Sequence, residues 1–283
     1  MEVPILTEKR NKMDTIITLF SYSFITRAVI VGILVSLCSS MLGVSLVLKR
    51  YSMIGDGLSH VSFGALAVAA ALNMAPLMVS VPIVIVAAFF LLRLSEQSSL
   101  GGDAAIAVFS SAALAIGIII TSVTTGINTD ICNYMFGSIL AMSHSDVVIS
   151  VILSIVVILA YMLFYNRIFA ITFDENFSRA TGVKVNIYNM TVAVLTAITI
   201  VLGMRIMGAL LISSLIIFPA LSAMRICRYF KGVIICSALI SVICFFLGIV
   251  LSYSMEIPVG ASVVVINLAV FMGLTLLGKI VKK

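Results

Sequence analysis

The strongest constraint on the fold of this chain is the recurrence of long apolar runs. Each run is about 18–22 residues long, which is the length that a helix needs to cross the hydrocarbon of a bilayer. The chain is also 62% hydrophobic and only 10% charged. We therefore predict an all-α polytopic membrane protein with about eight or nine transmembrane helices. The runs lie at 27–48, 57–73, 76–93, 104–124, 146–166, 187–204, 207–224, 231–252 and 259–279.

Two parts of the chain are expected from this pattern. Residues 1–26 are expected to form an N-terminal tail, and residues 27–283 the transmembrane domain. The stretch 14–26 is either an interfacial helix that changes the number of spans or part of a tail that is tolerated against the charge bias of the loops. The stretch 131–143 is too short for a full span and predicts a re-entrant or half helix. Turn-forming residues mark several breaks between the runs, at 73–76, 101–103, 126–130 and 256–258.

Basic residues gather in the loops on one side of the nine predicted spans. The positive-inside rule assigns that side to the cytoplasm, so the C-terminus is expected inside. Arg205 and the basic N-terminal tail fall on the opposite side, against the bias. The net charge of +6 is explained by these loops, and no long basic tract indicates a nucleic-acid partner. The loop residues are Lys49, Arg50, Arg93, Arg167, Arg179, Lys184, Arg225, Arg228, Lys231, Lys279, Lys282 and Lys283.

A carboxylate and an imidazole, Asp56 and His60, stand where the second apolar run begins. A charged side chain in hydrocarbon costs about 2.5–3.5 kcal/mol on insertion scales, so such residues are rare and usually functional. The spacing of four places both groups on one helix face. A carboxylate oxygen and an imidazole nitrogen make half of a transition-metal site, so we predict that the pair handles a metal ion crossing the membrane. The alternative is structural, with Asp56 capping the helix start and His60 bonding to a neighbouring helix.

One helix offers only two metal ligands, and a second copy of the chain would supply two more. A homodimer on a two-fold axis is the commonest oligomer and would bring two Asp56 and two His60 side chains together. Small residues continue the same face and predict either close helix packing or room for an ion path. These small residues are Gly64, Ala67 and Ala71, and the apolar candidates for a gate are Met53, Val61 and Phe63.

A polar island, residues 172–182, separates two apolar runs on the predicted cytoplasmic side. Its sequence predicts a short helix that starts at two acidic residues and ends at a glycine. Such a helix with an exposed aromatic side chain can dock into the groove of another protein, and the alternative is an ordinary loop helix. The candidate docking residues are Asp174, Glu175, Phe177, Ala180 and Gly182, within a coupling segment at about 167–186.

Other polar positions carry weaker signals. Pro219 breaks a span and frees a backbone carbonyl, and Ser213 and Ser214 satisfy such groups or line a path. His144 and Asp146 precede a span, where a solvated histidine and a helix cap explain them. The chain has no GxxxxGK[ST] loop for a nucleotide and no HExxH or GxSxG motif, so it is not expected to be an enzyme.

Several blocks, taken in order, resemble the membrane permeases of zinc and manganese ABC importers, the ABC-3 family. The resemblance covers residues 25–280. The stretch Lys49–His60 is similar to the family pattern RR-S-x-x-GD-x-L-x-H. Further matching blocks are Tyr134–Gly137, Asp174–Gly182, Gly208–Ala220 and Pro258–Ser262.

The resemblance implies a homodimeric permease with a type II, cobalamin-importer-like fold in a bacterial plasma membrane. It implies two copies of a cytoplasmic ABC ATPase and an extracytoplasmic metal-binding protein as partners, with ATP hydrolysis in the ATPase. It assigns Asp56 and His60 to the metal path and the polar island to the coupling helix. No cofactor is expected to stay bound, because the metal is the transported ion.

The run Val61–Gly64 lacks the proline that is common in manganese members, so zinc is favoured over manganese or iron. Three other functions are weighed against this one. A stand-alone secondary transporter would need driving-ion carboxylates inside the spans, where only Asp56 qualifies. An intramembrane enzyme would need a further base or nucleophile beside the pair. A permease for a metal chelate would tolerate the loss of His60.

Overall fold

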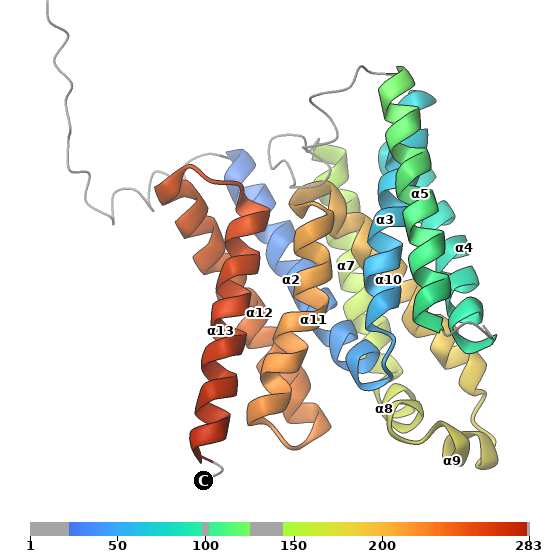
Figure 1. The fold of residues 1–283 in the computed structure, drawn as a ribbon, viewed down its shortest axis with the longest axis vertical. Coiled ribbons are helices and arrows are strands. Elements are labelled where there is room, and N and C mark those ends of the chain that lie inside the picture. Colours follow the sequence, from blue (N-terminus) through green and yellow to red (C-terminus); the bar gives the residue numbers. More distant parts are fainter. Residues whose placement is uncertain (1–22, 98–101, 125–143, 282–283) are drawn as a thin grey trace, which may run out of the picture.

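The computed structural model describes residues 23–97, 102–124 and 144–281, and all regular structure in these ranges is helical (Figure 1). The predicted interfacial helix at 14–26 and the predicted half helix at 131–143 lie wholly or mostly outside the described residues. The helices are α2 (Ser23–Leu48), α3 (Ser52–Ala71), α4 (Pro76–Gln97), α5 (Gly102–Thr124), α7 (His144–Leu163), α8 (Tyr165–Phe173), α9 (Glu175–Ala180), α10 (Val185–Met207), α11 (Ala209–Ile226), α12 (Phe230–Met255) and α13 (Val259–Val281).

Nine of the described helices are long and apolar enough to cross a membrane, namely all except α8 and α9. They coincide with the nine apolar runs, so the prediction of an all-α polytopic membrane protein is confirmed. The boundaries differ by a few residues, most at the second run, which begins at 57 whereas α3 begins at Ser52. The reason is that Asp56 lowers the local hydropathy without ending the helix, so a polar turn is part of the span.

The short connections have the chemistry that helix ends require. Asn73 and Glu256 both adopt positive φ values, after α3 and after α12, and each precedes a proline by two or three residues. Gly208 alone joins α10 to α11, with φ of 82°, a conformation that costs glycine little because it has no Cβ. These turns confirm the predicted breaks at 73–76 and 256–258, whereas 126–130 lies outside the described residues.

Helix α2 lies at the centre of the bundle and packs against α7, α10, α11 and α12. Gly43 allows its closest approach to α11, because a Cβ there would lie 2.0 Å from the Ile216 carbonyl oxygen. Hydroxyl groups add bonds between helices: Ser241 donates to the Ser36 carbonyl at 3.0 Å, and Ser45 bonds Tyr161 at 3.0 Å. Small residues and interhelical hydroxyl bonds are how membrane helices associate without a hydrophobic driving force.

Helices α8 and α9 lie together at the end of the bundle where the C-terminus lies (Figure 1). We call this the basic end, since the junctions α2–α3, α7–α10 and α11–α12, which carry most of the loop lysines and arginines, fall there. Helix α9 is therefore a short polar helix that lies outside the membrane-spanning helices, at their basic end.

Candidate metal site and coupling segment

Asp56 and His60 lie side by side on α3. The carboxylate Oδ2 is 3.6 Å from the imidazole Nε2. Two ligand atoms bound to one tetrahedral zinc ion at about 2.05 Å lie about 3.3–3.4 Å apart. The pair therefore already has nearly the spacing of two ligands of one ion, as the four-residue spacing predicts. By the helical rise of about 1.5 Å per residue, the two groups lie about 6 and 12 Å from the start of α3.

The structural alternative for Asp56 does not hold, because this residue lies in the second turn of α3. The residue at the N-cap is Tyr51, and no side chain caps the helix there. The Asp56 carbonyl instead accepts a hydrogen bond from the Ser59 hydroxyl at 2.7 Å. The Asp56 carboxylate therefore has no capping role in α3.

Helix α11 contributes a hydroxyl to this site. Ser213 Oγ lies 3.3 Å from Ser59 Oγ, next to His60 in the sequence. Ser213 follows the Gly208 break by little more than one turn, and this break brings the first turns of α11 beside α3. The sequence indicated Ser213 as a residue that satisfies freed backbone groups or lines a path, and the structure places it beside the Asp56–His60 pair.

The Asp56–His60 pair is open on one face of the chain. The Asp56 side chain is 45% exposed and that of His60 is 30% exposed, although most of α3 is buried. Met53, one turn before Asp56, shares this open face and is 38% exposed. Within the described residues no three His, Cys, Asp or Glu side chains gather to hold a metal. One chain therefore presents a carboxylate and an imidazole on an uncovered surface.

Beyond His60 the same helix face closes against α5. A Cβ on Gly64 would lie 2.9 Å from the Ala113 carbonyl oxygen, and one on Gly117 would lie 2.9 Å from Gly64 Cα. Ala67 is buried as well. Gly64 thus packs closely against α5 in this structure, as the helix-packing alternative expects.

The three gate candidates have different surroundings. Phe63 is buried, with its ring against Gly117, and clusters with Met204 and Ala209. Val61 is buried and lines an apolar hollow with phenylalanines of α4. Only Met53 is on the open face with the metal pair. A gating role for the three stays a prediction.

The polar island forms the short helix that its sequence predicts. Asp174 caps α9, accepting a hydrogen bond from the Phe177 backbone N–H at 2.8 Å. Gly182 follows the helix with φ of 84°, which suits a residue without a side chain. The Phe177 ring is 65% exposed, and Ala180 is exposed too. Helix α9 thus presents an apolar surface at the basic end that nothing in the described chain covers.

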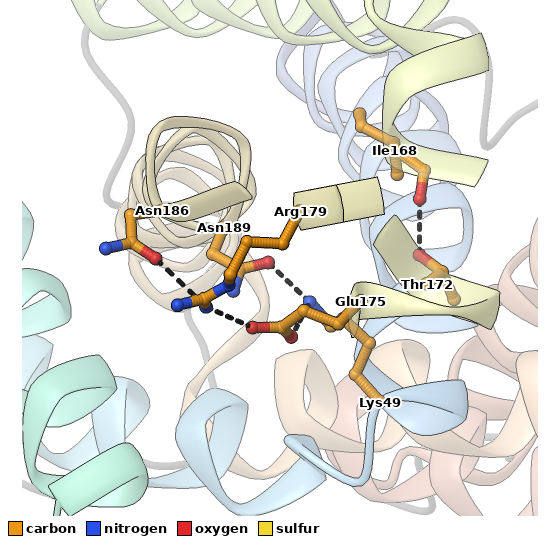
Figure 2. A network of polar contacts seen from close by, with 7 residues as sticks. All are labelled: Lys49, Ile168, Thr172, Glu175, Arg179, Asn186 and Asn189. Atoms are coloured by element: carbon orange, nitrogen blue, oxygen red, sulfur yellow. Dashed lines mark hydrogen bonds and ion pairs between the residues drawn. The ribbon is translucent and has the colours of Figure 1, made fainter. Parts of the chain in front are cut away.

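A buried lysine connects α9 to two membrane helices (Figure 2). Lys49, directly after α2, lies 3.3 Å from Glu175 Oε2 and donates a hydrogen bond to Asn189 of α10. Glu175 Oε1 also accepts a bond from Arg179 at 3.1 Å. Only 8% of the Lys49 side chain is exposed, so its charge depends on these partners.

The charges around Glu175 change its acidity. Partial burial disfavours the charged carboxylate, but the Lys49 ammonium and the hydrogen bonds from Lys49 and Arg179 outweigh it, so the pKa of Glu175 falls below its usual 4.5. Glu175 is therefore ionised at neutral pH, and its ion pair with Lys49 is present at that pH.

An ion pair that the sequence did not reveal lies at the opposite end of the bundle. Arg205, near the end of α10, donates to Asp146 in the first turn of α7, with 2.7 Å between Nη1 and Oδ1. Both side chains are largely buried. The pair explains why Arg205 departs from the charge bias of the loops, because it neutralises an acidic partner. It also corrects the interpretation of Asp146 as a simple helix cap.

The family of the chain follows from comparison with known proteins. The family model described as the ABC 3 transport family matches residues 21–278. The manganese import system permease protein ScaB of Streptococcus gordonii is 28% identical over 90% of this chain and 91% of its own length. The high-affinity zinc uptake system membrane protein ZnuB of Haemophilus influenzae is 27% identical over 86% of this chain and 94% of its own length.

A solved structure has the same fold. PsaBC from Streptococcus pneumoniae, in complex with Fab, superposes with a TM-score of 0.84 at 27% identity, covering 93% of this chain and 94% of that one. The predicted fold class and the resemblance are thereby confirmed. The chain belongs to the ABC 3 transport family, as a multi-pass permease subunit of a metal importer in which a separate ATPase subunit hydrolyses ATP.

Proposed function

We propose that this permease carries zinc into the cytoplasm along a path that includes Asp56 and His60. The observation that carries the proposal is the arrangement of this pair, 3.6 Å apart on an otherwise packed membrane helix. Imidazole nitrogen with carboxylate oxygen suits zinc, whereas an all-oxygen set would suit manganese better. Because one relative is named for manganese and another for zinc, the proposal of zinc rests on the chemistry of the two ligands.

The open face of the metal pair supports a homodimer. An ionisable side chain within a span is expensive against lipid and normally faces protein or a water-filled cavity. A second copy on a two-fold axis would cover this face and bring the ligands to two imidazoles and two carboxylates, enough for a tetrahedral ion. In this arrangement each protomer supplies half of the site.

Helix α9 is the proposed contact with the ATPase. Phe177 and Ala180 offer an apolar surface, and Asp174, Glu175 and Gly182 fix the ends of the helix. Two permeases would engage two ATPase copies in this way. The basic end then faces the cytoplasm of a bacterial cell, in line with the positive-inside rule, and an extracytoplasmic metal-binding protein docks at the other end.

The experiment that tests the proposal is metal uptake into proteoliposomes that hold the permease, its ATPase and its metal-binding protein. Wild type is compared with His60→Ala and Asp56→Asn for zinc and manganese at equal concentrations. We expect ATP-dependent zinc uptake, with a loss of at least about tenfold in either variant, since even outer-shell partners of a metal contribute 10–100-fold.

The matched control is His144→Ala, which removes the other histidine of the chain from an exposed position at the start of α7. Zinc uptake should persist in this variant. Unchanged uptake in His60→Ala would remove the pair from the path and favour a chelate as cargo. Faster manganese uptake would assign that metal, and uptake without the ATPase would indicate a secondary transporter.

A further inference from the structure

Two neighbouring cavities lie along α10 at the basic end. One, of about 370 Å³, lies between α8, α10 and the turn after α9. The other, of about 460 Å³, lies between α4 and α10. Ile187 and Thr191 line both, so the two cavities meet at this face of α10.

The first cavity is basic. Arg167 and Lys184 both line it and both are exposed. Among the side chains that the structure describes, neither cation forms an ion pair, in contrast to Lys49 and Arg179 nearby. Two uncompensated cations in one hollow at the end of the spanning helices attract an anionic group.

The second cavity is mostly apolar and extends into the spanning part of α10. Phe89 and Leu92 of α4 face Val194 and Leu195 of α10 across it. From Lys184 in the first cavity to Leu195 in the second, the helical rise gives about 16 Å for the two cavities together. This depth matches one leaflet, because half of the bilayer hydrocarbon is about 15 Å thick. Arg93, whose guanidinium lies over the Phe89 ring, adds a third cation to the wall.

We infer that these two cavities form one binding site for an anionic phospholipid. The phosphate lies between Arg167 and Lys184, and an acyl chain lies in the apolar cavity between α4 and α10. Free phosphate would use only the first cavity, and a neutral lipid would leave its two cations without a partner. The leaflet is the cytoplasmic one, a detail that rests on the proposed orientation; the site itself does not depend on the transported metal.

The position of the site gives the lipid a role in coupling. Thr181, Gly182 and Val183 form one wall of the basic cavity, and these residues directly follow α9. Gly182 is open to solvent, with no atom near the place of a Cβ. A bound headgroup would hold this turn, and with it the helix that we propose as the ATPase contact.

The test is native mass spectrometry of the purified permease complex in detergent with phosphatidylglycerol or phosphatidylcholine. We expect bound phosphatidylglycerol in wild type and about 30-fold weaker binding in the double variant Arg167→Gln/Lys184→Gln, because each cation contributes about fivefold. The matched control is Arg228→Gln/Lys231→Gln, which removes the same charge from exposed positions at the same end, outside both cavities. The control should bind like wild type.

A third variant separates the lipid from other occupants. Val194→Phe fills the apolar cavity and keeps all cations, so phosphatidylglycerol binding should fall while dimerisation and ATPase assembly persist. If both double variants lose phosphatidylglycerol binding equally, the lipid responds only to the overall surface charge, and the inference is overturned. Intact lipid binding in Val194→Phe would also overturn the inference, as would binding of glycerol phosphate as tight as that of the lipid. Loss of the dimer or of the ATPase contact in these variants would overturn it as well.

Discussion

Lys49 Nζ lies 3.3 Å from Glu175 Oε2, and this ion pair joins the corner between α2 and α3 to helix α9. The lysine precedes Asp56 by only seven residues, and a short turn separates it from α3. Asn189 holds the same ammonium from α10. One nearly buried side chain therefore connects the proposed ATPase contact with the corner that leads into α3, the helix of the proposed metal ligands Asp56 and His60.

Loss of this connection should reduce the metal moved per ATP more than it reduces ATP hydrolysis. Lys49→Met removes the charge from a site that is 8% exposed and leaves Glu175 without its buried partner. The measurement is the ratio of zinc uptake to phosphate release in proteoliposomes. Lys231→Met is the control, at an exposed lysine of the same end, and Lys49→Arg should recover part of the ratio. Equal ratios in the two methionine variants would contradict a coupling role.

The Glu175 carboxylate should stabilise the protein at neutral pH and not in acid. Its pKa is below the usual 4.5 in the folded chain, so its contribution is present above that value and is lost as the pH falls through the folded pKa. The Glu175→Gln variant should unfold at a lower temperature than wild type at pH 7, by an amount equivalent to at most about 1 kcal/mol for a partly solvated pair. The difference should vanish in strong acid. If the difference in unfolding temperature between Glu175→Gln and wild type is the same at every pH, the effect is due to packing and not to the charge of Glu175.

The nitrogen ligand should determine the preference between metals. His60→Asp replaces imidazole by carboxylate on the same helix face, and carboxylate suits manganese better than zinc. We expect the ratio of zinc to manganese uptake to fall, with the permease complex still assembled. His144→Asp makes the same chemical change far from the pair and should leave the ratio unaltered. An unaltered ratio in both variants would mean that selection occurs elsewhere, for instance at the metal-binding protein.

The spans could be predicted from the sequence because hydropathy depends on residue type alone. The pairing of polar side chains could not, since Arg205 and Asp146 are 59 residues apart and each looks like an isolated loop charge. Ser213 lies beside Ser59 and the proposed metal ligands because the break at Gly208 brings the start of α11 next to α3. The Asp56–His60 pair was accessible to sequence reasoning because both residues lie on one helix, where spacing fixes distance.

Breaking the ion pair between Arg205 and Asp146 should destabilise the bundle strongly. Removing one partner of a largely buried pair costs about 3–5 kcal/mol, because the attraction between the two charges is lost where water screens it little. Arg205→Leu and Asp146→Leu should each lower the thermal unfolding temperature in detergent, while the double variant should lose less than the sum of the two. Additive losses would show that the two side chains do not depend on each other.

The seam between α3 and α5 should tolerate no added side-chain volume at Gly117. A Cβ there would lie 2.7 Å from the Phe63 ring and 2.9 Å from Gly64 Cα, so Gly117→Val must push the two helices apart. Overpacking of this kind costs about 1–3 kcal/mol. Gly273→Val is the control, because no atom lies within 4 Å of its Cβ position on α13. Since α3 also carries Asp56 and His60, both zinc uptake and thermal stability should fall in Gly117→Val. Neither should fall in Gly273→Val. Full uptake in a destabilised Gly117→Val protein would show that the metal pair keeps its geometry when α3 shifts against α5.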